Sequence, residues 1–182
     1  MTRKLLLYLA LPLLTQCSKC KQDDPAPLDQ LPPATQTGAN TFGCLVNGQV
    51  YLPGGGSNGT PNYAVIYDSG FRGGSLQVLT YRYVGSGSNT QQNVSVIGDS
   101  ISRVGSYSLT STGGRAAIFL DRNRPSPCDQ FAGGSTIYTK GNLTITRLDL
   151  QAGIVSGTFS FTLYKAGCDT VKVTQGRFDK KL

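Results

Sequence analysis

The chain has 182 residues but no histidine, no glutamate and no tryptophan, so all ten of its acidic residues are aspartates. Without histidine there is no side chain that titrates near neutral pH in its ordinary state. A Ser-His-Asp or Cys-His nucleophile pair is excluded, and acid–base chemistry would fall to Asp, Lys, Tyr or Cys. We therefore expect no enzymatic activity, and we expect neither a cofactor nor a metal site.

The chain also has no concentrated run of basic residues, although its net charge is +7. Lysine and arginine are scattered over the whole length, and the densest group is Arg115, Arg122 and Arg124. Nucleic-acid-binding modules gather such residues on one face, so we expect no nucleic-acid partner. The scattered pattern is typical of a solvated surface, and the alternative for the densest group is attraction to an anionic polysaccharide or lipid headgroup.

The N-terminus carries a short apolar run, Leu5 to Leu14, directly after Arg3 and Lys4. As a helix the run would be about 15 Å long, roughly half of a bilayer core. A positive start followed by a short apolar run is typical of a secretory signal rather than a membrane-spanning helix.

The stretch that follows, Leu14-Thr15-Gln16-Cys17, resembles the lipobox of bacterial lipoproteins. In that family the cysteine receives a diacylglycerol, the signal is removed, and the new amino group is acylated. Gln16 stands where the family usually has Gly, Ala or Ser. The resemblance implies that residues 1–16 are a signal peptide and that Cys17 is the point of lipid attachment to the membrane.

Residues 17–41 are expected to form the lipidated cysteine and a disordered tether. The part from Ser18 to Thr41 has four prolines and no aromatic residue, a composition that favours extended chain. Its Lys21-Gln22-Asp23-Asp24 stretch resembles the export signal of Bacteroidota surface lipoproteins, and an ordinary polar linker is the equal alternative. We expect the protein at the bacterial outer membrane, on the cell surface or on the periplasmic face.

Residues 42–182 consist of short apolar or alternating runs separated by Gly, Asn, Asp and Ser, which predicts one antiparallel β domain. Asn47-Gly48 predicts a hairpin that pairs Val46 with Gln49, Leu45 with Val50 and Cys44 with Tyr51. Both faces of this hairpin are apolar, so we expect it inside the domain. Further strands are expected at Tyr63–Tyr67, Leu76–Val84, Asn93–Ile97, Tyr107–Thr110, Ala116–Leu120, Ser135–Thr139, Leu143–Leu150, Ile154–Tyr164 and Thr170–Thr174.

Strands of this number and length favour a β-sandwich, with a closed calycin-like barrel as the alternative. Val155, Phe159, Phe161 and Leu163 alternate with polar residues, so one face of their strand is expected to contact water. In the preceding segment the apolar residues change phase, which predicts a β-bulge near Thr146 or Arg147.

Three stretches of the chain resemble a group of small Bacteroidota lipoproteins without an established activity. They lie in residues 31–48, 143–161 and 167–179, and they include Asn47-Gly48 and Gly167-Cys168-Asp169. The resemblance implies an exported all-β domain and brings no catalytic or binding residues with it.

Two aspartate patterns and a set of tyrosines are candidate sites. Asp121-Arg122-Asn123 has alternating oxygen donors, but Ca²⁺ requires six or more oxygen ligands, so a turn is favoured. Asp121 with Asp129 could form the carboxylate pair of a glycoside hydrolase, although the sequence fixes no spacing between them. Exposed tyrosines could stack on sugar rings, but tyrosine is also common in strands, so packing is favoured over sugar binding. These tyrosines are Tyr63, Tyr67, Tyr81, Tyr83 and Tyr107.

Asp99-Ser100-Ile101 and Asp169-Thr170-Val171 resemble the acceptor motif of Bacteroidota protein O-glycosylation. The resemblance makes Ser100 and Thr170 candidate O-glycosylation sites. The motif is short and often arises by chance, so a chance occurrence is favoured at each site.

Five cysteines remain to be placed, and export favours their oxidation. With Cys17 given to lipid and Cys20 in the tether, three pairings are open among Cys44, Cys128 and Cys168. Cys128 and Cys168 both follow turn-forming residues and precede Asp, so we expect this pair to be the disulfide. Cys44 is expected to be a free thiol inside a strand, where it acts as a small apolar side chain.

Together these patterns favour a lipoprotein whose β-sandwich is a non-catalytic binding or structural accessory module of the cell envelope, with glycan or an envelope protein as its partner. The alternatives are a calycin-like carrier of a small apolar ligand and, less favoured, a hydrolase. The oligomeric state is left open.

Replacement of Cys17 by Ala should abolish membrane attachment, because two or more acyl chains hold a protein on a bilayer and this variant has no acceptor thiol. We expect the precursor to remain uncleaved and unlabelled in cells fed radioactive palmitate. Incorporation of label into the Cys17→Ala protein would show that the lipoprotein interpretation is wrong.

Overall fold

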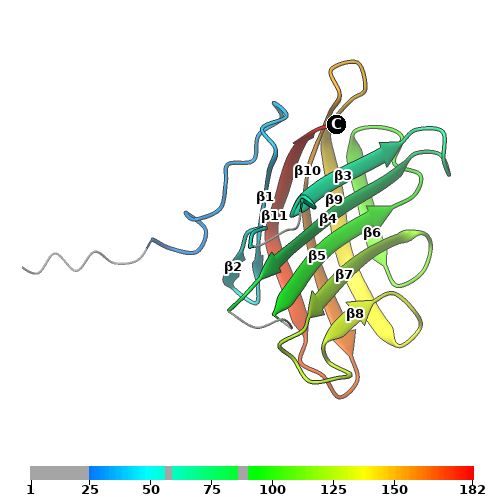
Figure 1. Ribbon diagram of the computed structural model, residues 1–182. Helices are drawn as coiled ribbons and strands as arrows, with labels where there is room; N and C mark the ends of the chain where they lie inside the picture. Colours follow the sequence, from blue (N-terminus) through cyan, green and yellow to red (C-terminus); the bar gives the residue numbers. More distant parts are fainter. Residues whose placement is uncertain (1–24, 56–58, 86–89) are drawn as a thin grey trace, which may run out of the picture.

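The chain forms two antiparallel β-sheets that pack face to face, as the computed structural model in Figure 1 shows. The structure describes residues 25–55, 59–85 and 90–182, and this part of the chain contains eleven strands and no helix. The strands are β1 (Thr41–Val46), β2 (Gln49–Tyr51), β3 (Tyr63–Asp68), β4 (Ser75–Tyr83), β5 (Gln91–Gly98), β6 (Gly105–Thr110), β7 (Arg115–Asp121), β8 (Gln130–Ala132), β9 (Ile137–Asp149), β10 (Ile154–Lys165) and β11 (Val171–Lys181).

One sheet has six strands in the order β2-β1-β11-β10-β9-β6, and the other has five in the order β3-β4-β5-β7-β8. Strands of the five-stranded sheet run obliquely across those of the six-stranded sheet (Figure 1). Each sheet ends at free edge strands, so the two do not close into a barrel. The predicted all-β sandwich is confirmed, and the calycin-like alternative is wrong.

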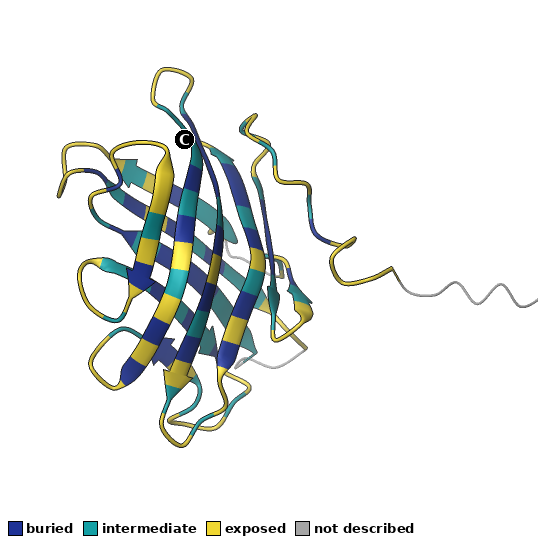
Figure 2. Cartoon of the chain, turned by 180° about the vertical axis from the view of Figure 1, so that it is seen from behind, coloured by how far each residue is buried: buried dark blue, intermediate teal, exposed yellow. Residues whose placement is uncertain are grey.

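The space between the sheets is filled by apolar side chains. Its largest fully buried members include Tyr51, Phe119 and Phe131. On β10, Phe159, Phe161 and Leu163 point into this core while the residues between them point outward, and Figure 2 shows the resulting bands of buried and exposed residues along the strands. The packed interior gives no support to a carrier of a small apolar ligand.

Two local features have the register that the sequence predicts. In the β1–β2 hairpin, Cys44 faces Tyr51 and Val46 faces Gln49, and both turn residues have positive φ, 49° at Asn47 and 81° at Gly48. In the β9–β10 pair, Arg147 faces Ser156 while Ile145 faces Gly157. Thr146 is therefore the extra residue of the predicted bulge.

Three strands differ from the expected pattern. β8 was not predicted, because it is only three residues long. β9 joins two expected strands through Gly141, where an added Cβ would lie 2.5 Å from Phe161 Cβ, so the glycine permits close contact with β10. β11 continues to Lys181 because a bulge at Gln175, with φ 55°, interrupts its alternation without ending the strand.

The β1–β2 hairpin lies at the edge of the six-stranded sheet rather than inside the domain. Phe42, Cys44 and Tyr51 are buried in the core. On the other face Val50 is partly exposed and Leu52 is 39% exposed. The expectation of two buried faces was wrong because an edge hairpin needs only one face against the core.

Residues 31–40, predicted as part of the tether, pack on the outer side of β1 and β11. Gly43 has no side chain, and an added Cβ would lie 2.7 Å from Pro32 Cδ, so the segment lies directly on β1. Leu31 is 7% exposed. The domain therefore begins about ten residues before Thr41, because specific contacts that composition does not reveal hold this segment in place.

The contact that holds the segment is the carboxylate of Asp179, which is 1% exposed. The backbone N–H groups of Thr37, Gly38 and Ala39 donate to it at 2.9, 2.9 and 3.0 Å. The hydroxyls of Thr35 and Ser156 donate at 2.7 and 2.6 Å. Three successive amides around one carboxylate form an anion-binding nest.

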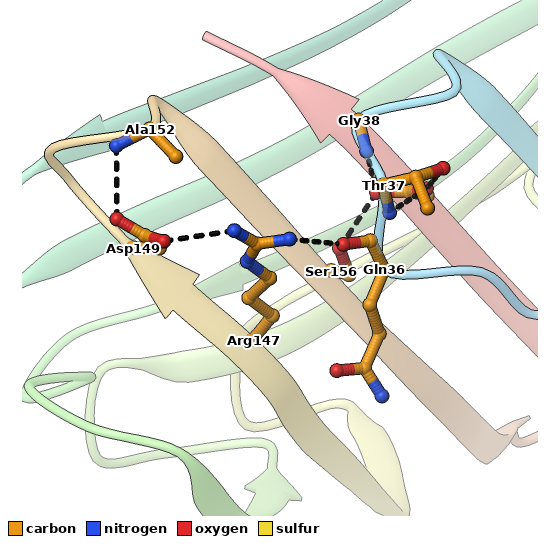
Figure 3. A network of polar contacts seen from close by, with 8 residues as sticks. Gln36, Thr37, Gly38, Arg147, Asp149, Ala152 and Ser156 are labelled. Carbon is orange, nitrogen blue, oxygen red and sulfur yellow. Dashed lines mark hydrogen bonds and ion pairs between the residues drawn. The ribbon is translucent and has the colours of Figure 1, made fainter.

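A neighbouring ion pair extends this network. Arg147 donates to the carbonyl oxygen of Gln36 at 2.6 Å and to the Asp149 carboxylate at 2.8 Å, as Figure 3 shows. Burial by itself would raise the pKa of Asp179, but the hydrogen bonds from Ser156, Thr35, Ala39 and Gly38 outweigh it and hold that pKa well below its usual range.

Replacement of Asp179 by Asn should lower the free energy of unfolding by about 3 kcal/mol or more, since a charged acceptor is lost and several donors stay buried. Because the pKa is depressed in the folded state, the stabilisation is present above the unfolded-state pKa of about 3.9 and is lost as pH falls below it. Urea titrations at pH 7 and at pH 2.5 should show a wild-type advantage that shrinks in acid.

Asp149→Asn serves as the control, because Asp149 is a partly exposed acceptor that does not bind the backbone amides of residues 37–39, and its loss should change stability little. Equal effects of the two substitutions at pH 7 would contradict the role assigned to Asp179.

Candidate functional site

The outer face of the six-stranded sheet has a polar part that the N-terminal segment does not cover, which we call the open face. Its side chains come from alternate positions on four neighbouring strands, and the residues between these positions point into the core. It consists of Ser106, Ser108 and Thr110 of β6, Tyr138, Lys140, Asn142 and Thr144 of β9, Thr158, Ser160, Thr162 and Tyr164 of β10, and Lys172 and Thr174 of β11.

Two tyrosines form an aromatic platform at one end of the open face. Tyr138 and Tyr164 face each other across β9 and β10, and they are 58% and 49% exposed. They are among the most exposed large side chains of the described residues. Directly opposite residues have Cβ atoms about 5 Å apart, so the two side chains leave the same face of the sheet next to each other.

At the other end the open face meets the N-terminal segment in a groove of about 540 Å³. Ala34 stands on one side, and the bulged Gln175 and Gly176 of β11 stand on the other. The floor carries hydroxyl and amide groups: Asn142 Nδ2 donates to Thr144 Oγ1 at 3.0 Å, and the Thr144 hydroxyl lies 2.9 Å from that of Ser106 on the neighbouring β6. These groups keep further donors and acceptors for a ligand.

A disulfide stabilises the end of the sandwich next to the tyrosines. Cys128, between β7 and β8, is bonded to Cys168, between β10 and β11, with a Cα–Cα distance of 5.5 Å. Lys165 Nζ also donates to the carbonyl oxygen of Pro127 at 2.6 Å. The predicted pairing of Cys128 with Cys168 is confirmed, and it joins the two sheets beside Tyr164.

Cys44 is a free thiol that is fully buried in the core, in agreement with its predicted place in a strand. Burial raises its pKa to about 12, against a smaller opposite effect of Arg82. The thiolate that a nucleophile requires is therefore disfavoured at neutral pH.

The structure brings Asp121 and Asp129 together in one turn, where the Asp121 backbone N–H donates to the Asp129 carbonyl oxygen at 2.8 Å. Asp121 accepts from the Asn123 backbone N–H at 3.1 Å and from Gln92 at 2.9 Å. Asp129 pairs with Arg122 at 3.0 Å. Each carboxylate is used by its own neighbours, and in the described ranges no group of three His, Cys, Asp or Glu residues is arranged to hold a metal ion.

The tyrosines that the sequence singled out are placed mainly by packing. Tyr63 and Tyr67 contact the core, the Tyr67 hydroxyl donates to the Ile101 carbonyl at 2.7 Å, and the Tyr107 hydroxyl donates to the Arg103 carbonyl at 2.7 Å. Tyr83 is 40% exposed, with its ring edge-on to Tyr81 at 5.8 Å. Tyr164 could have been recognised, because it continues the alternation of Thr158, Ser160 and Thr162, but its pairing with Tyr138 required the register of β9.

The remaining predicted sites are the lipid attachment residue and the two candidate O-glycosylation sites. Cys17 lies outside the described residues. Ser100 and Thr170 are exposed in loops, each followed by a fully buried apolar residue, Ile101 and Val171. The Ser100 hydroxyl donates to the Arg72 carbonyl oxygen at 3.4 Å, and O-glycosylation of both residues stays a prediction.

A second concave region, of about 460 Å³, lies on the outer face of the five-stranded sheet. Phe71, which is 52% exposed, stands at this hollow. Arg72 is already paired with Asp99 at 2.9 Å and lies 5.1 Å from the Phe71 ring. Arg115, which also lines this hollow, donates to the carbonyl oxygens of Ser108 and Asp99 at 3.3 and 3.4 Å.

No family model, curated protein or solved structure matches this chain. Among the residues described, no helix is long and apolar enough to cross a bilayer. The geometry of the open face is therefore the basis for a functional proposal.

Replacement of both Cys128 and Cys168 by Ser should lower the free energy of unfolding by about 4 kcal/mol, the chain-entropy estimate for a loop of this length. Denaturant titration should give the same value for reduced wild-type protein, and the double variant should not respond to reductant. A cross-linked peptide that contains Cys44 in non-reducing peptide mapping would contradict the pairing.

Proposed function

We propose that this chain is a lipid-anchored lipoprotein of the bacterial outer membrane and that its β-sandwich is a non-catalytic module that binds glycan through the open face. The lipobox-like Leu14-Thr15-Gln16-Cys17 and the resemblance to Bacteroidota lipoproteins support the location. The paired, exposed Tyr138 and Tyr164 next to rows of hydroxyl groups are the observation that carries the binding role.

Sugars present apolar C–H faces and many hydroxyl groups, and the open face offers the complement of both. Tyrosine rings provide flat apolar surface together with a polar hydroxyl. Ser160 and Asn142 lie one row beyond Thr162 on the same face and face each other across the strands. Hydroxyl and amide groups both donate and accept hydrogen bonds, so the face can contact several sugar units in succession.

The shape of the open face favours binding over catalysis. Its residues lie on strands that are hydrogen-bonded on both sides, except at the β6 edge, so the face is held rigid before a ligand arrives. Preorganisation of this kind reduces the entropy cost of association. The side chains that form the open face carry hydroxyl, amide, phenol and ammonium groups.

The Tyr138→Ala/Tyr164→Ala variant should lose about tenfold or more in glycan affinity, since each stacking contact contributes about 0.5–1.5 kcal/mol. Both rings are exposed, so the thermal unfolding temperature should change little. Binding of the purified lipoprotein in detergent to a glycan array and to soluble polysaccharides, followed by titration calorimetry, measures the affinity.

Tyr83→Ala is the matched control, because Tyr83 is an exposed tyrosine of the other sheet. The proposed function is wrong if no glycan binds. It is also wrong if the Tyr83→Ala variant loses as much affinity as the double variant.

A further inference from the structure

Within the described part of the chain, two cations of the open face have no counter-charge. Four arginines on other parts of the surface each pair with an aspartate within 3.5 Å: Arg72 with Asp99, Arg122 with Asp129, Arg124 with Asp121 and Arg147 with Asp149. Lys140 and Lys172 are exposed, and over the described ranges neither ammonium group has an ion pair or hydrogen bond.

These two lysines stand on either side of one hydroxyl. Thr162 on the central strand β10 faces Lys172 of β11 on one side and Lys140 of β9 on the other. Neighbouring strands are about 4.8 Å apart, so the two lysine Cα atoms are roughly 10 Å apart with Thr162 between them. The flexible lysine side chains can bring both ammonium groups toward a single anion above the Thr162 hydroxyl.

The tyrosine platform lies next to this position. Tyr138 and Tyr164 are the next outward residues of β9 and β10, two positions along each strand, which corresponds to about 6.7 Å. An anionic group between the lysines would therefore be adjacent to a ring stacked on the tyrosines. The two tyrosines, the Thr162 hydroxyl and the two lysines therefore lie together on one rigid part of the sheet.

No acidic group of the described structure neutralises this patch. Asp149 and Asp179 are bound within the network at the other end of the sheet. Asp169, in the β10–β11 turn, is exposed and forms no ion pair with either lysine. Two nearby cations without a counter-charge repel each other, and a bound anion removes that repulsion.

We infer that the ligand of the open face is an acidic glycan, with a carboxylate or sulfate group held between Lys140 and Lys172 above Thr162 and an adjacent sugar ring stacked on Tyr138 and Tyr164. This inference rests on the proposed function and specifies its ligand class. It assigns Lys140, Lys172 and Thr162 as binding residues.

The test compares the purified lipoprotein with polygalacturonate, alginate and chondroitin sulfate, and with the same polymers after carboxyl reduction and, for the last, desulfation. At least one acidic polymer should bind about tenfold more tightly than its neutral counterpart at low salt, and the difference should shrink as salt screens the charges. Lys140→Gln/Lys172→Gln should remove this difference and its salt dependence.

Arg103→Gln/Lys181→Gln is the matched control, because it removes the same net charge at exposed positions outside the open face. Equal loss of affinity in both double variants would overturn the inference, since overall charge would then account for binding. Equal affinity for acidic and neutral polymers, with the tyrosine variant still defective, would overturn the inference and leave the proposed function standing. Binding to none of the polymers, and to no glycan of the array, would overturn both.

Discussion

The buried carboxylate of Asp179 is the interaction on which the arrangement of the outer sheet face depends. It lies on β11, and it gathers donors from residues 35–39 and from Ser156 of β10. A buried charge is costly unless its hydrogen-bonding capacity is filled, and here segments about 140 residues apart in the sequence fill it together. Because this network fixes the N-terminal segment over one half of the face, it also decides which half is left open.

The open half lies between two fixed boundaries. On one side the N-terminal segment and the bulge of β11 form the groove, and on the other the disulfide Cys128–Cys168 and Lys165 hold the two sheets together. Between them the side chains stand on continuous strands rather than on loops. A surface of this kind binds with little reorganisation, which suits recognition of an extended polymer better than enclosure of a small molecule.

Local patterns in the sequence predicted local structure well. Asn47-Gly48 gave the register of the first hairpin, the phase change near Thr146 gave the bulge, and the turn residues before Cys128 and Cys168 gave the disulfide, because each depends on neighbouring residues. The place of residues 31–40 and the meeting of Tyr138 with Tyr164 depend on which strands become neighbours. The composition of residues 31–40 also did not indicate that they pack on the sheet. Their contacts are made largely by backbone amides, which every residue except proline carries.

The packed N-terminal segment would have a mechanical consequence if the domain is anchored through Cys17, as proposed. A pull from that side would reach the domain first at residues 31–39, ahead of β1, and would be transmitted through Asp179 to β11, which is flanked by strands on both sides. The force would then be distributed over the hydrogen bonds between the long β11 and its neighbouring strands. It would not first separate the short β1–β2 hairpin from the edge of the sheet. Resistance to such a force depends on the unfolding rate rather than on equilibrium stability. The segment would therefore slow the unfolding of the domain under a pulling force.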